Sequence, residues 1–214
     1  AKAYCQEKVH ANNNLKLEAA RALFEGKQKL YVRANEVKQM LLAIDLGKTF
    51  GFNIVIVGGG ESFQIAGLLA DNKIPVILDE THALPATEDD DVDQPYKTPA
   101  QLQKAGVLFA MNDVADNTKS RNLSFNAGTA ATYGLTKEEA LSSITLNTAK
   151  ILGIDNVTGS IEAGKDANII ISTGDILDMR GNQLTQIFIQ GRTVSLDNKQ
   201  LQLYERYKHK YGIK

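Results

Sequence analysis

One histidine stands out as a candidate for chemistry because it closely follows an apolar run. His82 lies in the segment LDETHALP, directly after the run IPVIL at residues 74–78. An imidazole titrates near neutral pH and can serve as a base or as a metal ligand. The alternative is a loop histidine that bonds to the backbone. We expect His82 to lie at the carboxyl end of a strand, which makes it a candidate catalytic residue.

An arginine occupies the corresponding place in an earlier apolar run. Arg33 is in the run KLYVRA at residues 29–34. A guanidinium binds carboxylates through two parallel hydrogen bonds, so Arg33 is a candidate substrate-binding residue. Alternatively, Arg33 pairs with an acid of the same protein, such as Asp79 or Asp113.

Three further polar segments could bind ions. Arg121 follows the run VLFAM at residues 107–111 and is a second candidate for substrate binding, although a helix N-cap explains its neighbour Asn122 equally well. The three glycines at 58–60 could present backbone N–H groups to an anion, but they lack the spacings of nucleotide-binding loops, and a tight turn is the alternative. The acidic loop at residues 88–93 could bind Ca²⁺, but it has no EF-hand register, and a solvated loop is the alternative.

The positions of these candidate residues depend on an alternation of strands and helices along the chain. Apolar runs at residues 29–34, 53–57, 74–78 and 107–111 read as strands. Segments with helical periodicity follow each of them, the last two being residues 123–133 and 137–152. This alternation predicts an α/β fold with one parallel sheet of four strands in sequential order and helices on one side. Short strands at 168–172, 186–189 and 193–196 and a charged helix at 201–211 follow.

The segment from Thr136 to Gly174 carries the longest pattern in the chain. Thr136 and Glu139 form a capping box, and Gly153 ends the helix that they begin. The helix contains the pattern T-x-N-x-A-x-x-L-G at residues 145–153. The pattern G-S-I-x-x-G-K-x-A-N follows at residues 159–168.

Both patterns resemble the carboxyl-terminal end of the amidohydrolase superfamily, specifically its imidazolonepropionase-like and prolidase-like members. The resemblance implies half of a TIM-barrel-like parallel sheet at residues 1–153, corresponding to the second half of a (β/α)8 barrel. Residues 154–214 would then be part of an accessory β segment and a terminal helix. The first four strands of such a barrel are not in this sequence, although a closed barrel needs all eight.

The resemblance also implies a metal site, usually zinc, at the carboxyl ends of the strands. The family places histidines on the fifth and sixth strands, where this chain has Arg33 and the glycines at 58–60. At the eighth strand Asp113, or its neighbour Asn112, holds the expected aspartate position. An arginine or a glycine does not replace a metal ligand. We therefore assign no metal ligand in this chain, expect a degenerate metal site, and take Asp113 with His82 as the candidate catalytic residues.

Two functions follow from this comparison. The first is a hydrolase of non-peptide carbon–nitrogen bonds that forms part of a larger protein. The second is a catalytically inactive module with a binding or structural role. The partner in either case is a small molecule, and a half barrel predicts a homo-oligomer or a missing amino-terminal half.

Composition narrows the remaining classes of partner. The formal net charge of −1 gives no reason to expect nucleic acid or an anionic membrane surface. The single cysteine, Cys5, excludes an internal disulfide. No run of apolar residues is long enough for a transmembrane helix. The chain begins without Met, so we expect a fragment or a processed product, and the compartment is not indicated.

Overall fold

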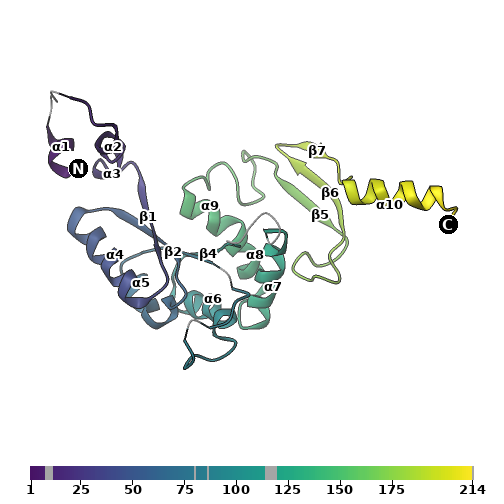
Figure 1. Cartoon of the computed structure of the whole chain (residues 1–214), viewed down its shortest axis with the longest axis horizontal. Helices are drawn as coiled ribbons and strands as arrows, with labels where there is room; N and C mark the ends of the chain where they lie inside the picture. Colours follow the sequence, from purple (N-terminus) through teal and green to yellow (C-terminus); the bar gives the residue numbers. More distant parts are fainter. Residues whose placement is uncertain (8–11, 80, 86, 114–119, 214) are drawn as a thin grey trace.

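The computed structural model of the chain describes residues 1–7, 12–79, 81–85, 87–113 and 120–213. Its main feature is a four-stranded parallel sheet in the order β1-β2-β3-β4 (Figure 1). The strands are β1 (Lys29–Ala34), β2 (Asn53–Gly58), β3 (Val76–Leu78) and β4 (Phe109–Met111). The predicted parallel sheet and its sequential order are therefore confirmed.

Five α-helices pack on one face of this sheet. They are α4 (Val37–Phe50), α5 (Ala66–Asp71), α6 (Gln94–Ala105), α7 (Leu123–Thr132) and α8 (Lys137–Ile144), with the short 3-10 turns η1 (Ser62–Ile65) and η2 (Ser120–Asn122) before α5 and α7. Met40, Leu69, Leu102 and Phe109 are fully buried between helices and sheet. These side chains form the main hydrophobic core, because every second strand residue points toward the helices.

The opposite face of the sheet is covered at one place, which the sequence did not predict. Ile151 of α9 (Leu146–Leu152) packs there against Val55 and Ala110. A single helix over 137–152 was expected, but the backbone leaves helical geometry at Thr145, with φ −130° and ψ −91°. The break turns α9 away from α8, so the expectation that all helices lie on one side is wrong for α9.

The last turn of α9 is tied to the first strand. The Lys29 Nζ donates a hydrogen bond to the Ile151 carbonyl oxygen at 2.6 Å, and the Tyr31 hydroxyl donates to the same oxygen at 3.3 Å. A helix leaves its last carbonyls without intrahelical partners, and an amine stabilises them. These contacts hold α9 across the amino-terminal ends of the strands.

The amino-terminal segment folds as three short helices, α1 (Lys2–Gln6), α2 (Leu15–Glu18) and α3 (Arg21–Phe24). Phe24 packs edge-on against Phe52 at a ring-centroid distance of 5.0 Å, and against Phe50 at 6.3 Å. The aromatic cluster joins this segment to the end of α4.

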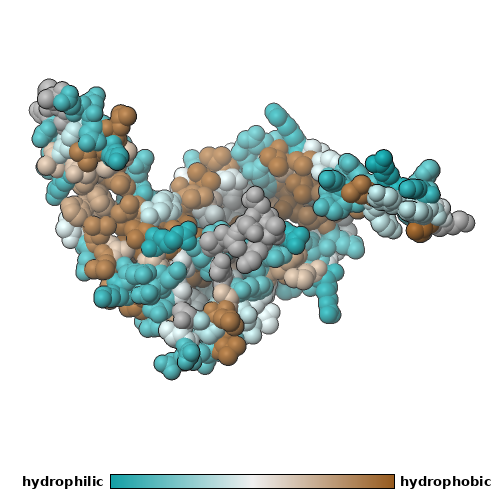
Figure 2. Space-filling view, viewed as in Figure 1, coloured by the Kyte–Doolittle hydropathy of each residue, from teal (hydrophilic) through white to brown (hydrophobic). Residues whose placement is uncertain are grey.

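The carboxyl-terminal part is a separate antiparallel sheet of β5 (Ile169–Ser172), β6 (Leu184–Ile189) and β7 (Arg192–Val194). Apolar side chains of this sheet, such as Ile170 and Ile189, are about half exposed, and Figure 2 shows hydrophobic residues on this part of the surface. The last helix, α10 (Lys199–Lys210), has no buried residue and extends away from the rest of the molecule (Figure 1). None of the described helices is long and apolar enough to cross a membrane.

Candidate functional site at the carboxyl ends of the strands

Three polar side chains form a hydrogen-bonded chain across the carboxyl ends of the strands. The Arg33 guanidinium donates to Asp79 Oδ2 at 2.7 Å, and Asn112 Nδ2 donates to Asp79 Oδ1 at 2.9 Å. Arg33 is on β1, whereas Asp79 and Asn112 directly follow β3 and β4. Because the strands are parallel and in order, their ends meet at one edge, and Asp79 bridges β1 to β4.

The two partners of the ion pair differ in burial. The Asp79 side chain is 10% exposed, whereas the Arg33 side chain is 64% exposed. One of the alternatives left open by the sequence is therefore realised, since Arg33 pairs with Asp79. The pair uses one terminal nitrogen of Arg33, so the rest of the guanidinium faces outward with donors to spare.

A cavity of about 360 Å³ adjoins this ion pair, and we call it the strand-end cavity. Thr81 lines it, is only 4% exposed, and has a hydroxyl group without a hydrogen-bond partner in the described part of the chain. Buried polar groups are nearly always hydrogen-bonded, so an unpaired hydroxyl beside a cavity calls for an explanation. The lining consists of Arg33, Asn35, Gly60, Leu78, Asp79, Thr81, Ala83, Leu84, Pro85, Asp90, Gln94, Pro95 and Thr98.

His82 lies outside the strand-end cavity, against α6 and α7. Its Nε2 is 2.6 Å from Thr129 Oγ1, and its ring meets Tyr96 edge-on at 5.8 Å. The alternative considered from the sequence was a loop histidine that bonds to the backbone. In the structure, His82 instead contacts the side chain of Thr129. Partial burial lowers the pKa of His82 below its ordinary value of 6.5, and the Asp113 carboxylate opposes that shift. The imidazole is therefore mostly neutral at pH 7.

Asp113 follows β4 and faces α7. Asn126 Nδ2 donates to its Oδ2 over a long 3.4 Å, while Asn126 is 3% exposed and its Oδ1 has no partner among the described residues. Arg121 is exposed on η2 and does not line the strand-end cavity. Asn122 occupies the N-cap position of α7, as the capping explanation expects, but its side chain makes no cap hydrogen bond.

The glycines at 58–60 form a tight turn that packs on the preceding strand–helix connection. Gly58 and Gly59 have φ of 108° and 64°, and a Cβ on Gly58 would collide with the Asn35 side chain. The Gly59 amide donates to Ala34 O at 2.8 Å, and the Glu61 amide donates to Asn35 O at 2.9 Å. These amides are occupied within the fold, which favours the turn over an anion site.

The acidic loop is partly neutralised by a lysine of α6. Lys97 Nζ lies 2.9 Å from Asp91 Oδ2 and 2.6 Å from Asp93 Oδ1. Hydrogen bonds to these two carboxylates raise the pKa of Lys97 above its ordinary range. The arrangement agrees with a solvated loop.

Among the residues that the structure describes, the strand ends supply no donor set for a metal ion. The residues where the resemblance expects histidines are a cationic Arg33 and the side-chain-free Gly58. Within residues 1–7, 12–79, 81–85, 87–113 and 120–213, no group of three or more His, Cys, Asp or Glu side chains is placed to hold a metal. These residues therefore do not fit the family's zinc, and the degenerate metal site stays a prediction.

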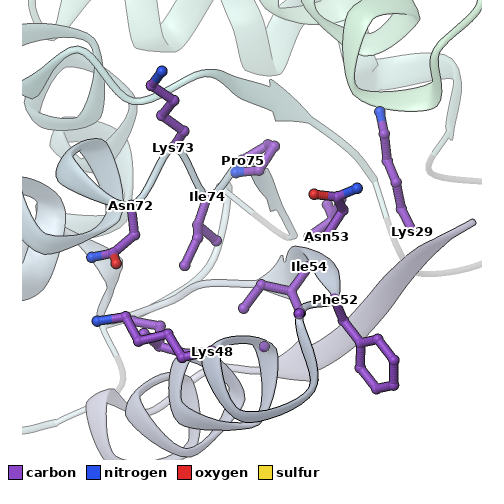
Figure 3. Close-up of a pocket in the computed structure, with 13 residues that line it drawn as sticks. Lys29, Lys48, Phe52, Asn53, Ile54, Asn72, Lys73, Ile74 and Pro75 are labelled. Carbon is purple, nitrogen blue, oxygen red and sulfur yellow. The ribbon is translucent and has the colours of Figure 1, made fainter. Parts of the chain in front are cut away.

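A second cavity of about 380 Å³ lies at the opposite ends of the strands (Figure 3). Lys29, Lys48 and Lys73 line it, but Lys29 Nζ already bonds to the carbonyls at the end of α9. Active sites of parallel α/β barrels lie at the carboxyl ends, whereas the amino-terminal face serves stability. The strand-end cavity is therefore the candidate site.

Of the predicted site residues, the structure brings Arg33 to the strand-end cavity, whereas His82, Asp113 and Arg121 do not line it. Asp79 was named only as a possible partner of Arg33, and Thr81 was not singled out. A usable signal existed for Asp79, because it directly follows the run at 74–78 as Asn112 follows the run at 107–111.

The chain is similar to curated proteins over part of its length. The chain is similar to imidazolonepropionase of Flavobacterium psychrophilum, with 31% identity over 109 residues, covering 47% of this chain and 26% of that protein. It is also similar to imidazolonepropionase of Flavobacterium johnsoniae, with 36% identity over 81 residues, covering 36% of this chain and 20% of the relative. The matched region is thus about a quarter or less of each relative's length.

Solved structures extend the similarity over most of the chain. A crystal structure of an amidohydrolase from Thermotoga maritima MSB8 superposes with a TM-score of 0.76 and 30% identity, covering 91% of this chain and 51% of that one. A prolidase structure with 18% identity and a TM-score of 0.60 shares the fold. The family model for the amidohydrolase family matches residues 61–194. This chain therefore belongs to the amidohydrolase family.

Proposed function

We propose that this chain is the substrate-binding half of a hydrolase that acts on non-peptide carbon–nitrogen bonds. The family match supports the reaction class. The chain spans about half the length of the Thermotoga maritima amidohydrolase, so the remaining part of such a site would come from protein outside this sequence. The chain's own contribution is to bind and orient a small molecule at the strand ends.

The Arg33–Asp79–Asn112 chain is the observation that carries this proposal. It lies at the edge of the sheet where barrel enzymes bind their substrates. A buried carboxylate with two donors holds the guanidinium in place beside a cavity of about 360 Å³. A cavity of this size is within the range of small-molecule sites.

His82 and Asp113 are the candidates for proton transfer. A general base must be unprotonated at the working pH. The lowered pKa of His82 meets that condition at neutral pH, and Asp113 lies close enough to act on it electrostatically.

A non-catalytic binding module is the second candidate. The Arg33–Asp79 ion pair favours it, because a fixed cation lies where the resemblance expects a metal ligand. Such a chain would bind the same small molecules at the strand-end cavity without hydrolysing them.

The two candidates separate in one experiment. The purified chain is incubated with a panel of cyclic and linear amides, with and without added Zn²⁺, while binding is measured by calorimetry and hydrolysis by release of the acid. Hydrolysis that is lost in Asp113→Asn and His82→Gln, but kept in the matched controls Asp89→Asn and His209→Gln, supports the hydrolase. Binding without hydrolysis, even when the chain is expressed together with the protein that supplies the rest of the barrel, supports the module. Failure to bind any amide contradicts both.

A further inference from the structure

The strand-end cavity is lined by two side chains of opposite charge that have capacity for a ligand. Arg33 donates to Asp79 through one nitrogen, and its other N–H groups make no hydrogen bond with a described residue. Asp90 is half-buried, lines the same cavity, and its carboxylate has no partner in the described part of the chain. Both carboxylate oxygens of Asp79 already accept hydrogen bonds within the fold, so we do not assign Asp79 to the ligand.

Thr81 adds an independent sign that a ligand belongs here. It is 4% exposed, it lines the cavity, and its hydroxyl lacks a partner among the described residues. A hydroxyl can donate or accept, so it suits either end of a polar ligand.

The rest of the wall is mainly apolar. Leu78, Ala83, Leu84, Pro85 and Pro95 contribute apolar surface to it, beside the polar Asn35, Gln94 and Thr98. A lining that combines apolar surface with two charged groups favours a ligand that has a short hydrocarbon part and polar ends.

We propose that the strand-end cavity binds a small zwitterion, whose carboxylate contacts Arg33 and whose cationic group contacts Asp90. This inference rests on the proposed function and names the class of its substrate. The charges present explain the preference, because Arg33, Asp79 and Asp90 together leave one net negative charge, while the spare donors of Arg33 still lack an acceptor, which a simple amine could not supply. A simple anion would meet that charge, whereas a zwitterion satisfies both ends.

The test is a calorimetric titration of the whole chain with a series of ω-amino acids, from glycine through γ-aminobutyrate to ε-aminocaproate. The matched carboxylates and alkylamines of equal length carry one charge each. We expect one member of the series to bind at least about tenfold tighter than both of its single-charge analogues, since each end makes a charge-assisted hydrogen bond.

Variants assign the two ends. Asp90→Asn should weaken the zwitterion about tenfold and leave the carboxylate analogue unchanged, whereas Arg33→Gln should weaken both. Asp89→Asn is the matched control, because Asp89 is exposed on the same loop and does not line the cavity. Thr81→Val keeps the shape and removes the hydroxyl, so it should also weaken binding of the zwitterion, and circular dichroism checks that each variant is folded.

Two results would overturn the inference. One is a series in which no zwitterion binds tighter than its single-charge analogues, and the other is equal weakening by Asp90→Asn and Asp89→Asn. Either result leaves the proposed function standing if amides still bind in an Arg33-dependent way. Loss of all binding, amides included, would remove the proposed function as well.

Discussion

Arg33 puts a permanent positive charge at the end of β1, and Asp79 holds that charge in place at 2.7 Å. A metal cation bound nearby would meet this charge without any ligand from β1, and Gly58 offers none from β2. We therefore predict that the protein produced from this sequence contains no stoichiometric zinc after dialysis, as measured by elemental analysis. Zinc at one equivalent that is lost in His82→Ala or Asp113→Ala would contradict the prediction.

His82 makes the stability of the fold depend on pH. Its pKa is lowered in the folded protein, so the unfolded chain binds the proton more readily. Its contribution to stability is therefore fully present above about pH 6.5 and is lost as the pH falls from there toward the folded pKa. We predict that urea unfolding between pH 7.5 and 5 shows a smaller loss of stability in His82→Gln than in the original chain.

Proton NMR of the His82 ring provides a direct check, since the ring should titrate below 6.5. His209→Gln is the control, because that residue is exposed on α10 and should leave the pH dependence of unfolding unchanged. A His82 pKa at or above 6.5 would refute the argument.

Individual residues were predictable where one local rule decides their role. The capping box of Thr136 and Glu139 and the left-handed Gly51 and Gly153 depend on neighbours in sequence. Thr81 was beyond reach, because its unpaired hydroxyl results from packing between segments that are distant in sequence. The choice of Asp79 over Asp113 as the partner of Arg33 likewise needed the strand order and register.

At the scale of elements, α8 offers a clear test of local chemistry. The Glu139 amide donates to Thr136 Oγ1 at 3.2 Å, and the Thr136 amide donates to Glu139 Oε2 at 2.8 Å. We predict that Thr136→Ala lowers the free energy of unfolding by about 1 kcal/mol, because the Glu139 amide loses the hydroxyl that accepts its hydrogen bond.

Urea denaturation measures this cost. Glu138→Ala is the matched control, since Glu138 is in the same first turn but takes no part in the capping box. Its loss should cost at most about 0.3–1 kcal/mol through the helix dipole. Equal destabilisation by both variants would show that charge in the first turn matters more than the cap.

The order of the elements was predictable from the sequence. The residues at which they begin and the change of direction between α8 and α9 were not. Apolar runs located all four strands, whereas β3 begins only at Val76, after Pro75, which has no amide to donate. Helix α6 begins at Gln94, with Pro95 in its first turn where proline is favoured, and continues through Pro99. The break at Thr145 has no proline or glycine to announce it, so α9 was read as a continuation of α8.

At the scale of the molecule, the open face of the sheet is only partly covered. Val55 and Ala110 are buried under Ile151, but Tyr31 on the edge strand is 42% exposed. The terminal segments do not close this face, because α10 has no buried residue and α3 packs on the phenylalanines at the end of α4. The described residues of the terminal helices therefore leave this face of the sheet open.

An edge strand with unpaired backbone groups beside an apolar face favours association with another chain. Each apolar side chain that such an association buries contributes roughly 1.5–3 kcal/mol. The simplest closed assembly of identical chains is a two-fold dimer, in which the same surface of each copy meets its counterpart. We propose that two copies bury their open faces against each other around β1.

We predict that light scattering on dilute protein gives twice the chain mass of 23.3 kDa. Tyr31→Lys should shift the mass toward the monomer, because a charge would be buried at the centre of the contact without a partner. Leu42→Lys is the matched control, since Leu42 is 64% exposed on α4, away from the open face, and its change should leave the dimer intact. A stable 23.3 kDa monomer that unfolds cooperatively would refute the dimer and show that α9 alone covers enough of the sheet.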